Sequence, residues 1–246
     1  MAVDTAKPGA PVPIGKPRTG LCNLIVQGDR LYWSDEEGDG GLWSAQLDGS
    51  GAKRLWKTPA RSRIERVAVR GRDPVLLVWT KLPDPPERKG MGMGIGLGNL
   101  GKLEEDPTET ADAMLIPRGG RATSIWHAQG SASDLDADAD DVVVCTHRGI
   151  VRVPSGRGGK ATPLTRACRG ELRLWQGWSL EAEGDVHEGA PLVARKVTGP
   201  EPSVPILPRL YGGARNLVLD ADAVYACAVG AKPERCDLVR LPERLR

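Results

Sequence analysis

The feature that most constrains this chain is an internal repeat of about forty residues, the period at which solenoids, propellers and other arrays repeat. Its clearest pair of copies is NLIVQGDRLYWSD, which starts at Asn23, and NLVLDADAVYACA, which starts at Asn216. Each copy has an Asn, an apolar run, a polar turn with an aspartate, and a second apolar run that contains a Tyr. This order predicts two β-strands joined by a short turn.

Two further copies share this turn. RVAVRGRDPVLLVW begins at Arg66 and LDADADDVVVCT begins at Leu135, so the aspartate markers are Asp29, Asp73, Asp140 and Asp222. Each copy is followed by a second half with a strand, a turn rich in Gly or Pro, and another strand. Each unit therefore has four predicted strands. Because the last interval between markers is about twice the first, we expect a divergent unit over residues 171–208.

The sequence therefore predicts an all-β fold, a β-propeller of five four-stranded blades that spans residues 1–246 as one domain. The last unit stops after its third strand. PVPIG (11–15) resembles the fourth strands SVPIL (203–207) and ATPLT (161–165), so we expect the N-terminal segment to complete the last blade and close the ring. Closure of this kind removes the exposed sheet edges that favour aggregation.

One repeat resembles the YWTD class of β-propellers, the type found in low-density-lipoprotein receptors and in many bacterial proteins. The resemblance rests on Tyr32–Asp35, Leu42, Leu47–Ser50, and Arg54 with Leu55. It covers one repeat well and the others only through their period and turn residues. Members of that class usually have six blades. A count of six therefore stays open beside five, with the sixth blade merged around residues 83–111 or 171–208.

Charge and hydropathy exclude several classes of function. The chain has 34 Lys and Arg against 32 Asp and Glu, a net charge of +2, and no basic block that could neutralise a row of phosphates. Nucleic acid is therefore not an expected partner. No apolar run is long enough for a membrane span or for the core of a signal peptide. On this basis we expect a cytoplasmic protein without an export signal.

A Gly- and Met-rich segment, residues 83–111, is expected as an insertion in the second blade. GLGNLG (96–101) matches a dinucleotide fingerprint, and GLGNLGK (96–102) matches a phosphate loop except that Leu103 replaces Ser or Thr. Both motifs need a strand before them and a helix after them, and this sequence predicts neither. We therefore expect a loop without a nucleotide or any other cofactor. Its Met91 and Met93 would provide adaptable apolar contacts.

Metal binding is also not expected. Carboxylates at alternate positions, which calcium prefers, occur in the run Asp134, Asp136, Asp138, Asp140 and Asp141. However, Ala139 occupies the place of the turn glycine in calcium loops, and LDADA recurs at residues 219–223, so a solvated repeat turn is favoured. No zinc or catalytic-base spacing connects the three histidines His127, His147 and His187.

A propeller enzyme stays open as the alternative function. Some lactonase-type propellers hold a metal in their central channel through Asn and carboxylates of the inner strands. Asn23 and Asn216 recur at the starts of inner strands and are candidate channel-lining residues. Recurrent Asn at such positions is more often a hydrogen-bonding turn residue. The sequence therefore favours a non-catalytic binding module over a metal-dependent lactonase or lyase.

A binding surface is predicted from propeller topology. Connections between strands 2 and 3 of each blade share one face with the links between blades. We expect a monomer that uses this face to bind a protein or a carbohydrate. The candidate residues are Asp35, Glu36, Glu37, Asp39, Trp79, Met91, Met93, His147 and Arg148.

The cysteines give one predicted disulfide. Cys227 and Cys236 flank a loop between neighbouring strands, and opposed strands bring Cβ atoms within disulfide range. Such a bond would indicate a secreted or periplasmic protein, in conflict with the missing export signal. Cys145 aligns with Cys227 and is expected to be a small core residue. Cys22 and Cys168 receive no role.

Overall fold

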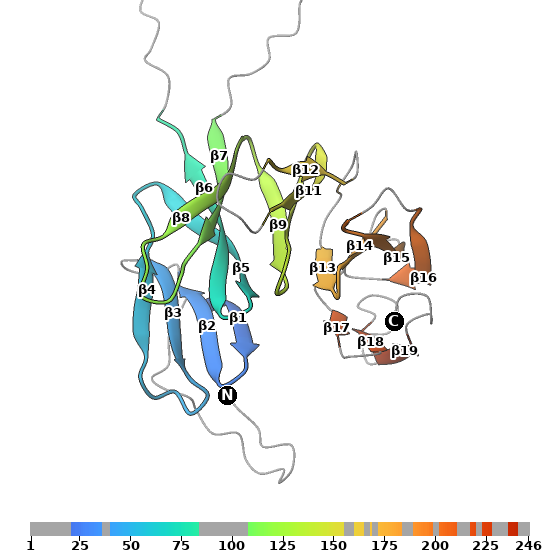
Figure 1. Cartoon of the computed structure of the whole chain (residues 1–246), viewed down its shortest axis with the longest axis horizontal. Coiled ribbons are helices and arrows are strands. Elements are labelled where there is room, and N and C mark those ends of the chain that lie inside the picture. Colours follow the sequence, from blue (N-terminus) through green and yellow to red (C-terminus); the bar gives the residue numbers. More distant parts are fainter. Residues whose placement is uncertain are drawn as a thin grey trace, which may run out of the picture.

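The computed structural model describes residues 21–35, 40–83, 108–154, 160–164, 168, 172–183, 189–198, 202–210, 217–219, 223–227 and 236–240. Regular structure in these residues consists of β-strands, and none of them forms a helix that could cross a membrane. The strands form antiparallel sheets in which neighbours in sequence are neighbours in space (Figure 1). This is the all-β organisation that the repeat predicts.

The first three sheets have four strands each. Sheet 1 contains β1 (Leu21–Gln27), β2 (Arg30–Asp35), β3 (Gly41–Gln46) and β4 (Lys53–Lys57). Sheet 2 contains β5 (Ser62–Arg70), β6 (Asp73–Lys81), β7 (Glu109–Leu115) and β8 (Thr123–Gln129). Sheet 3 contains β9 (Ala132–Ala137), β10 (Val142–Thr146), β11 (Gly149–Val153) and β12 (Thr162–Pro163).

The remaining strands form two more sheets. Sheet 4 contains β13 (Leu172–Trp175), β14 (Trp178–Ala182), β15 (Ala190–Lys196) and β16 (Val204–Leu210). It corresponds to the divergent unit expected over residues 171–208. Sheet 5 has three described strands, β17 (Leu217–Leu219), β18 (Ala223–Cys227) and β19 (Cys236–Arg240). The predicted closing strand, residues 11–15, lies outside the described residues.

Two-residue turns join the first two strands of several sheets. Gln27 pairs with Arg30 and Arg70 pairs with Asp73, so Gly28 and Gly71 occupy the turns, each with a φ of 59°. Only glycine adopts this left-handed conformation without steric cost. The polar turn that marks the repeat in the sequence is therefore the turn that sets the register of these hairpins.

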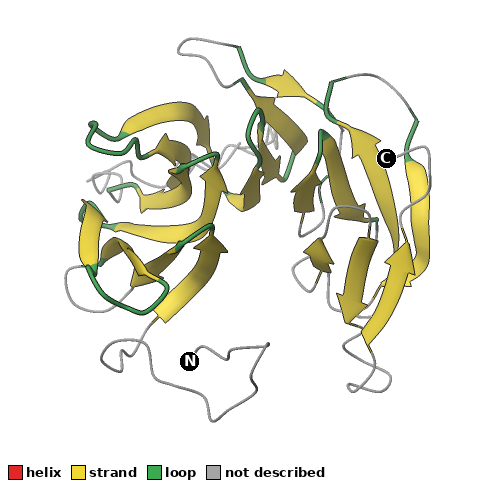
Figure 2. Cartoon of the chain, turned by 60° about the horizontal axis from the view of Figure 1, so that its bottom comes forward, coloured by secondary structure: helices red, strands yellow, loops and turns green. Residues whose placement is uncertain are grey.

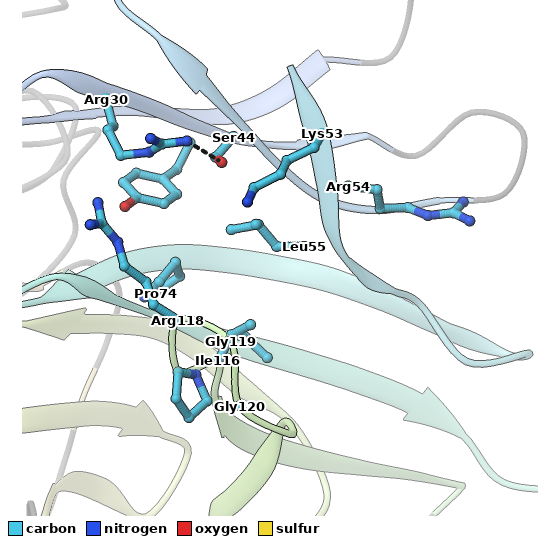
Figure 3. A pocket seen from close by; sticks show the side chains of 12 residues that line it. Arg30, Ser44, Lys53, Arg54, Leu55, Pro74, Ile116, Arg118, Gly119 and Gly120 are labelled. Atoms are coloured by element: carbon cyan, nitrogen blue, oxygen red, sulfur yellow. Dashed lines mark hydrogen bonds between the residues drawn. The ribbon is translucent and has the colours of Figure 1, made fainter. Parts of the chain in front are cut away.

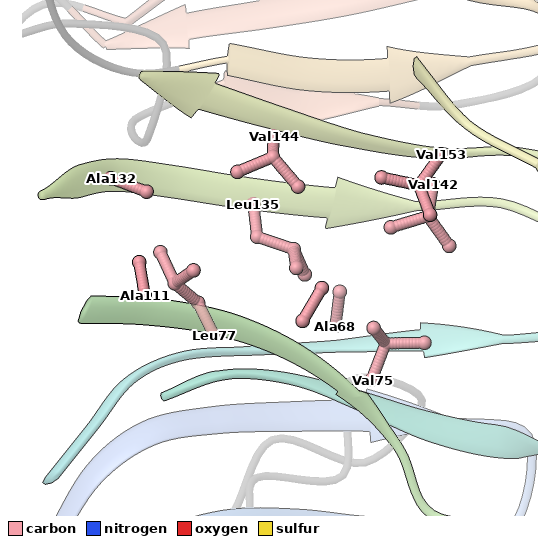
Figure 4. Close-up of a cluster of buried hydrophobic side chains, with 10 residues drawn as sticks. Ala68, Val75, Leu77, Ala111, Ala132, Leu135, Val142, Val144 and Val153 are labelled. Carbon is pink, nitrogen blue, oxygen red and sulfur yellow. The ribbon is translucent and has the colours of Figure 1, made fainter. Parts of the chain in front are cut away.

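Apolar layers lie between successive sheets, because the central strands bury both of their faces. In β6, Leu76 and Val78 pack toward sheet 1, whereas Val75 and Leu77 pack toward sheet 3. Figure 4 shows the layer between sheets 2 and 3, to which β9 contributes the fully buried Leu135. Alternate residues of one strand thus serve two different layers, which explains the uninterrupted apolar runs in the sequence.

The first strands of the sheets come together at the centre of the molecule. β1 contacts β5, β5 contacts β9, and β9 contacts β13. The sheets follow one another in sequence order around an arc (Figures 1 and 2), and Leu217 of β17 packs against the core of sheet 4. This radial arrangement of antiparallel sheets is the architecture of a β-propeller.

The structure corrects the cysteine prediction. Cys145 of β10 forms a disulfide with Cys168, with 5.6 Å between their Cα atoms. The expectation that Cys145 is only a small core residue is therefore wrong. Cys227 and Cys236 are register partners in β18 and β19, but their side chains lie outside the described part of the structure. Their disulfide stays a prediction.

Candidate functional site

The connections between strands define two faces of the propeller. The link face carries the second connection of each sheet and the links between sheets. Hydrogen bonds connect the links between sheets to the ends of the strands beside the second connection. The backbone N–H of Lys81 donates to the carbonyl of Arg61, and the backbone N–H of Gly130 donates to the carbonyl of Glu109. The turn face carries the first and third connections of each sheet. The grouping of connections agrees with the topology predicted from the sequence.

The predicted binding residues that the structure describes lie at or near the link face. Asp35 ends β2, Trp79 is in β6, and His147 and Arg148 form the turn between β10 and β11. The guanidinium of Arg63 lies 4.4 Å from the centre of the Trp79 ring. Outside the described residues lie the remaining binding candidates, Glu36, Glu37, Asp39, Met91 and Met93, and the channel-lining candidate Asn216. A binding role for this face stays a prediction.

At the centre of the propeller, Asn23 holds neighbouring strands together. It lies at an irregularity of β1 with a φ of 51°, a conformation that Asn tolerates better than most residues. Its Nδ2 donates to Ser34 Oγ at 3.0 Å, and its Oδ1 accepts from Arg66 Nη1 at 3.2 Å. Both ends of the amide are therefore engaged in structural hydrogen bonds.

Arg66 and Asp134 continue this network across three sheets. Arg66 Nε of β5 donates to Asp134 Oδ1 of β9 at 2.6 Å, and Asp134 is fully buried. The backbone N–H of Leu172, in β13, donates to the other carboxylate oxygen at 3.0 Å. Burial raises the pKa of Asp134, and the positive charge of Arg66 opposes this rise. One carboxylate thus connects sheets 2, 3 and 4.

Two more aspartates of the suspected calcium run repeat this contact. The Leu174 N–H donates to Asp136 Oδ2 at 2.8 Å, and the Gly177 N–H donates to Asp138 Oδ2 at 3.4 Å. Burial raises the pKa of Asp136 to about 6. We call Asp134, Asp136 and Asp138 the aspartate ladder. Because side chains at alternate strand positions share one side, the ladder can accept hydrogen bonds from alternate residues of β13 and from the turn that follows it.

The aspartate ladder therefore has a structural role. The prediction of a solvated turn fits Asp140, which is exposed, and is wrong for the buried Asp134. Within the residues that the structure describes, no group of three or more His, Cys, Asp or Glu side chains is arranged to hold a metal ion. The aspartates bind backbone N–H groups of sheet 4, and two of them also form ion pairs, Asp134 with Arg66 and Asp136 with Arg173.

The candidate functional site is a recess on the turn face, which we call the inter-sheet pocket. It has a volume of about 340 Å³ and lies between sheets 1 and 2 (Figure 3). It is lined by Arg30, Tyr32, Ser44, Lys53, Arg54, Leu55, Pro74, Ile116, Pro117, Arg118, Gly119 and Gly120. A second recess of about 330 Å³ shares Arg30, Tyr32 and Arg118 and adds Arg72.

Side chains of opposite character line the inter-sheet pocket. Tyr32, Pro74 and Ile116 are buried and provide an apolar floor. Arg30, Lys53 and Arg118 provide positive charge around it. Arg30 is held by a hydrogen bond from its Nη2 to Ser44 Oγ at 3.1 Å, and the β7–β8 turn is held by a bond from the Arg118 N–H to Asp73 Oδ1 at 3.1 Å.

Comparison with known proteins supports the fold. No protein-family model and no curated protein matches the sequence. Among solved structures, a puromycin hydrolase S511A mutant complexed with PGG has a TM-score of 0.58 at 15% identity, over 92% of this chain and 36% of that chain. The acylaminoacyl peptidase of Pyrococcus horikoshii has a TM-score of 0.54 at 12% identity, over 84% of this chain and 35% of that one.

The matching parts of these solved structures are β-propeller domains. This chain is a β-propeller. It spans about a third of the length of the two solved structures, and at such low identity the likeness shows the fold alone. The YWTD resemblance and the blade count of the β-propeller stay predictions.

Proposed function

We propose that this β-propeller is a non-catalytic binding module whose ligand occupies the inter-sheet pocket. The observation that carries the proposal is a contrast between two sets of polar side chains. Asn23, Arg66 and the aspartate ladder bind one another and backbone groups, so they hold the sheets together. The charged side chains of the pocket surround a recess of a size that suits a small molecule.

The chemistry of the pocket favours binding over reaction. Its lining contains arginine and lysine side chains, two hydroxyl groups and apolar residues. No carboxylate or imidazole, the usual general bases, is among these described lining residues. The alternative, a lactonase- or lyase-like enzyme with a channel site, requires inner-strand side chains that can coordinate a metal. Asn23 already uses both ends of its amide within the protein.

We also propose that the propeller has five blades and that residues 11–15 close the ring. Sheet 5 has three described strands, one fewer than each of the other sheets. On β1, at the opposite end of the arc, Leu24 and Val26 have exposed fractions of 54% and 58%. Closure would cover these apolar side chains, which lie on the innermost strand of sheet 1.

The link face stays the predicted surface for a protein or carbohydrate partner. Hydrogen exchange measured with and without a bound partner would test this prediction. We expect the partner to protect the backbone amides of His147 and Arg148 from exchange. Protection confined to the turn face would contradict the prediction.

The binding proposal is tested by affinity selection. The purified chain is incubated with a mixed library of small molecules, and retained compounds are identified by mass spectrometry. We expect at least one compound to be retained and to be recovered chemically unchanged after prolonged incubation. Turnover of a retained compound by the wild-type chain, but not by variants of the pocket, would contradict a non-catalytic module.

A further inference from the structure

We propose that the inter-sheet pocket binds a small ligand that carries an oxyanion, a phosphate or a carboxylate, on a flat apolar body. The inference rests on the proposed binding function and adds the chemical class of the ligand. It is carried by the charge of the pocket, by its apolar floor, and by the fact that no described carboxylate forms an ion pair with its three cations.

Three cationic side chains from two sheets converge on the pocket. Figure 3 shows the side chains of Arg30, Arg118 and Lys53 around one recess, with the Arg30 guanidinium directed at Ser44 and with Arg54 pointing away. Arg30 belongs to β2 and Lys53 to β4, whereas Arg118 lies in the β7–β8 turn. Two guanidinium forks with an ammonium group beside them suit the several oxygen atoms of a phosphate or carboxylate.

Several other arginines of the propeller are paired with carboxylates, unlike the pocket cations. Arg66 is paired with Asp134, Arg152 with Asp141 at 2.5 Å, and Arg195 with Glu183. Within the described part of the chain, no carboxylate lies at ion-pair distance from Arg30, Lys53 or Arg118. The nearby Asp73 accepts the backbone N–H of Arg118. The positive charge of the pocket is therefore available to a ligand.

Part of the cation arrangement is already fixed before a ligand binds. Arg30 is half-buried, and its bond to Ser44 Oγ at 3.1 Å orients the guanidinium through one of its five N–H groups. The remaining N–H groups can bind an anion. An arginine that is already oriented loses less conformational entropy when it binds a ligand.

The apolar floor indicates what the oxyanion is attached to. Tyr32, Pro74 and Ile116 are buried, and Leu55 is half-buried at the side of the pocket. These side chains give an apolar contact next to the cations. An aromatic ring with one phosphate or carboxylate group would contact both surfaces at once. A fully hydrated inorganic anion would use the cations alone.

The probes are phenyl phosphate, phenylacetate, benzyl alcohol and benzylamine, each titrated into the full chain by calorimetry at low ionic strength. We expect binding of at least one of the two anions, and no measurable binding of the alcohol or the amine. The preferred anion distinguishes a phosphate ligand from a carboxylate ligand. Equal binding of benzyl alcohol, or binding of neither anion at millimolar concentration, would overturn the proposal.

The variants Arg118→Gln and Arg121→Gln locate the binding site. Both remove one positive charge from an exposed side chain in the same segment, but Arg121 does not line the pocket. Loss of one charge-assisted contact should weaken binding of the anion at least about tenfold in Arg118→Gln. Binding to Arg121→Gln should change less than about twofold. Equal losses in both variants would indicate attraction to general surface charge and refute the site.

The same experiment separates the two proposals. If a neutral ligand found by affinity selection binds the pocket and the anions do not, the oxyanion inference fails and the binding module stands. If phenyl phosphate releases phenol in the presence of the wild-type chain but not of Arg118→Gln, the pocket is catalytic and the proposed function fails.

Discussion

Replacement of Asp134 by alanine is predicted to destabilise the propeller strongly. Asp134 is fully buried and accepts hydrogen bonds from Arg66 and from the Leu172 N–H. Its removal leaves the Arg66 guanidinium in the interior without its carboxylate, and Arg66 Nη2 already has no hydrogen-bond partner among the described residues. Loss of one member of a buried ion pair typically costs about 3 to 5 kcal/mol.

The free energy of unfolding can be measured by urea titration with tryptophan fluorescence, since the chain has 7 Trp residues. Asp140→Ala is a matched control, because Asp140 lies in the turn that follows the ladder and is exposed. We expect it to change the stability by less than about 0.5 kcal/mol. The double variant Arg66→Met/Asp134→Leu removes both charges and should be more stable than Asp134→Ala.

A loss below about 1 kcal/mol in Asp134→Ala would refute the reasoning, because it would mean that the Arg66 charge needs no buried partner. The same conclusion would follow if Asp140→Ala and Asp134→Ala were equally destabilised.

Three further predictions concern other parts of the propeller. Burial raises the pKa of Glu181 to about 7, above its value in the unfolded chain. The folded state therefore binds more protons than the unfolded state at intermediate pH, and stability should fall between about pH 4.5 and 7. In Glu181→Gln, the fall in the free energy of unfolding over this pH range should be smaller by about 2 to 3 kcal/mol. A pH profile of urea stability identical to that of the wild-type chain would contradict this prediction. Cys168→Ser should destabilise the oxidised protein by about 3 kcal/mol, since the disulfide spans 23 residues, and should have no effect when both proteins are measured in reductant. Deletion of residues 1–16 should lower the melting temperature, because it removes the proposed closing strand, and an unchanged melting temperature would rule out that closure.

Local sequence patterns predicted most of the fold because they report short-range geometry. The Gly and Asp turn residues located the β1–β2 and β5–β6 hairpins, and apolar alternation identified sheet 4 although its marker is missing. In the structure, β6 ends at Lys81 and β7 begins at Glu109, so the last residues of the predicted insertion, from Glu109, belong to β7.

Contacts between sheets could not be predicted in the same way. The aspartate ladder has the local spacing of a calcium loop. Its carboxylates accept hydrogen bonds from backbone N–H groups of β13, and this could be seen only once β13 was found to pack beside β9. Cys145 was placed correctly in a strand, but its partner Cys168 follows β12 and carries no local signal.

The inter-sheet pocket was missed for the same reason. Arg30, Lys53 and Arg118 lie in three separate segments of the sequence and match no motif. The repeat could have placed all three at the turn face, since each lies in or next to a first or third connection of its sheet. Their convergence depends on the packing of sheet 1 against sheet 2.

The role of the inter-sheet pocket is tested most directly by a crystal structure of the full chain grown with phenyl phosphate at low ionic strength. We predict the phosphate group within hydrogen-bond distance of Arg30 and Arg118 and the ring against Tyr32 and Ile116. Phenyl phosphate bound only at the link face or among the central strands, with the inter-sheet pocket empty, would contradict the proposed binding site.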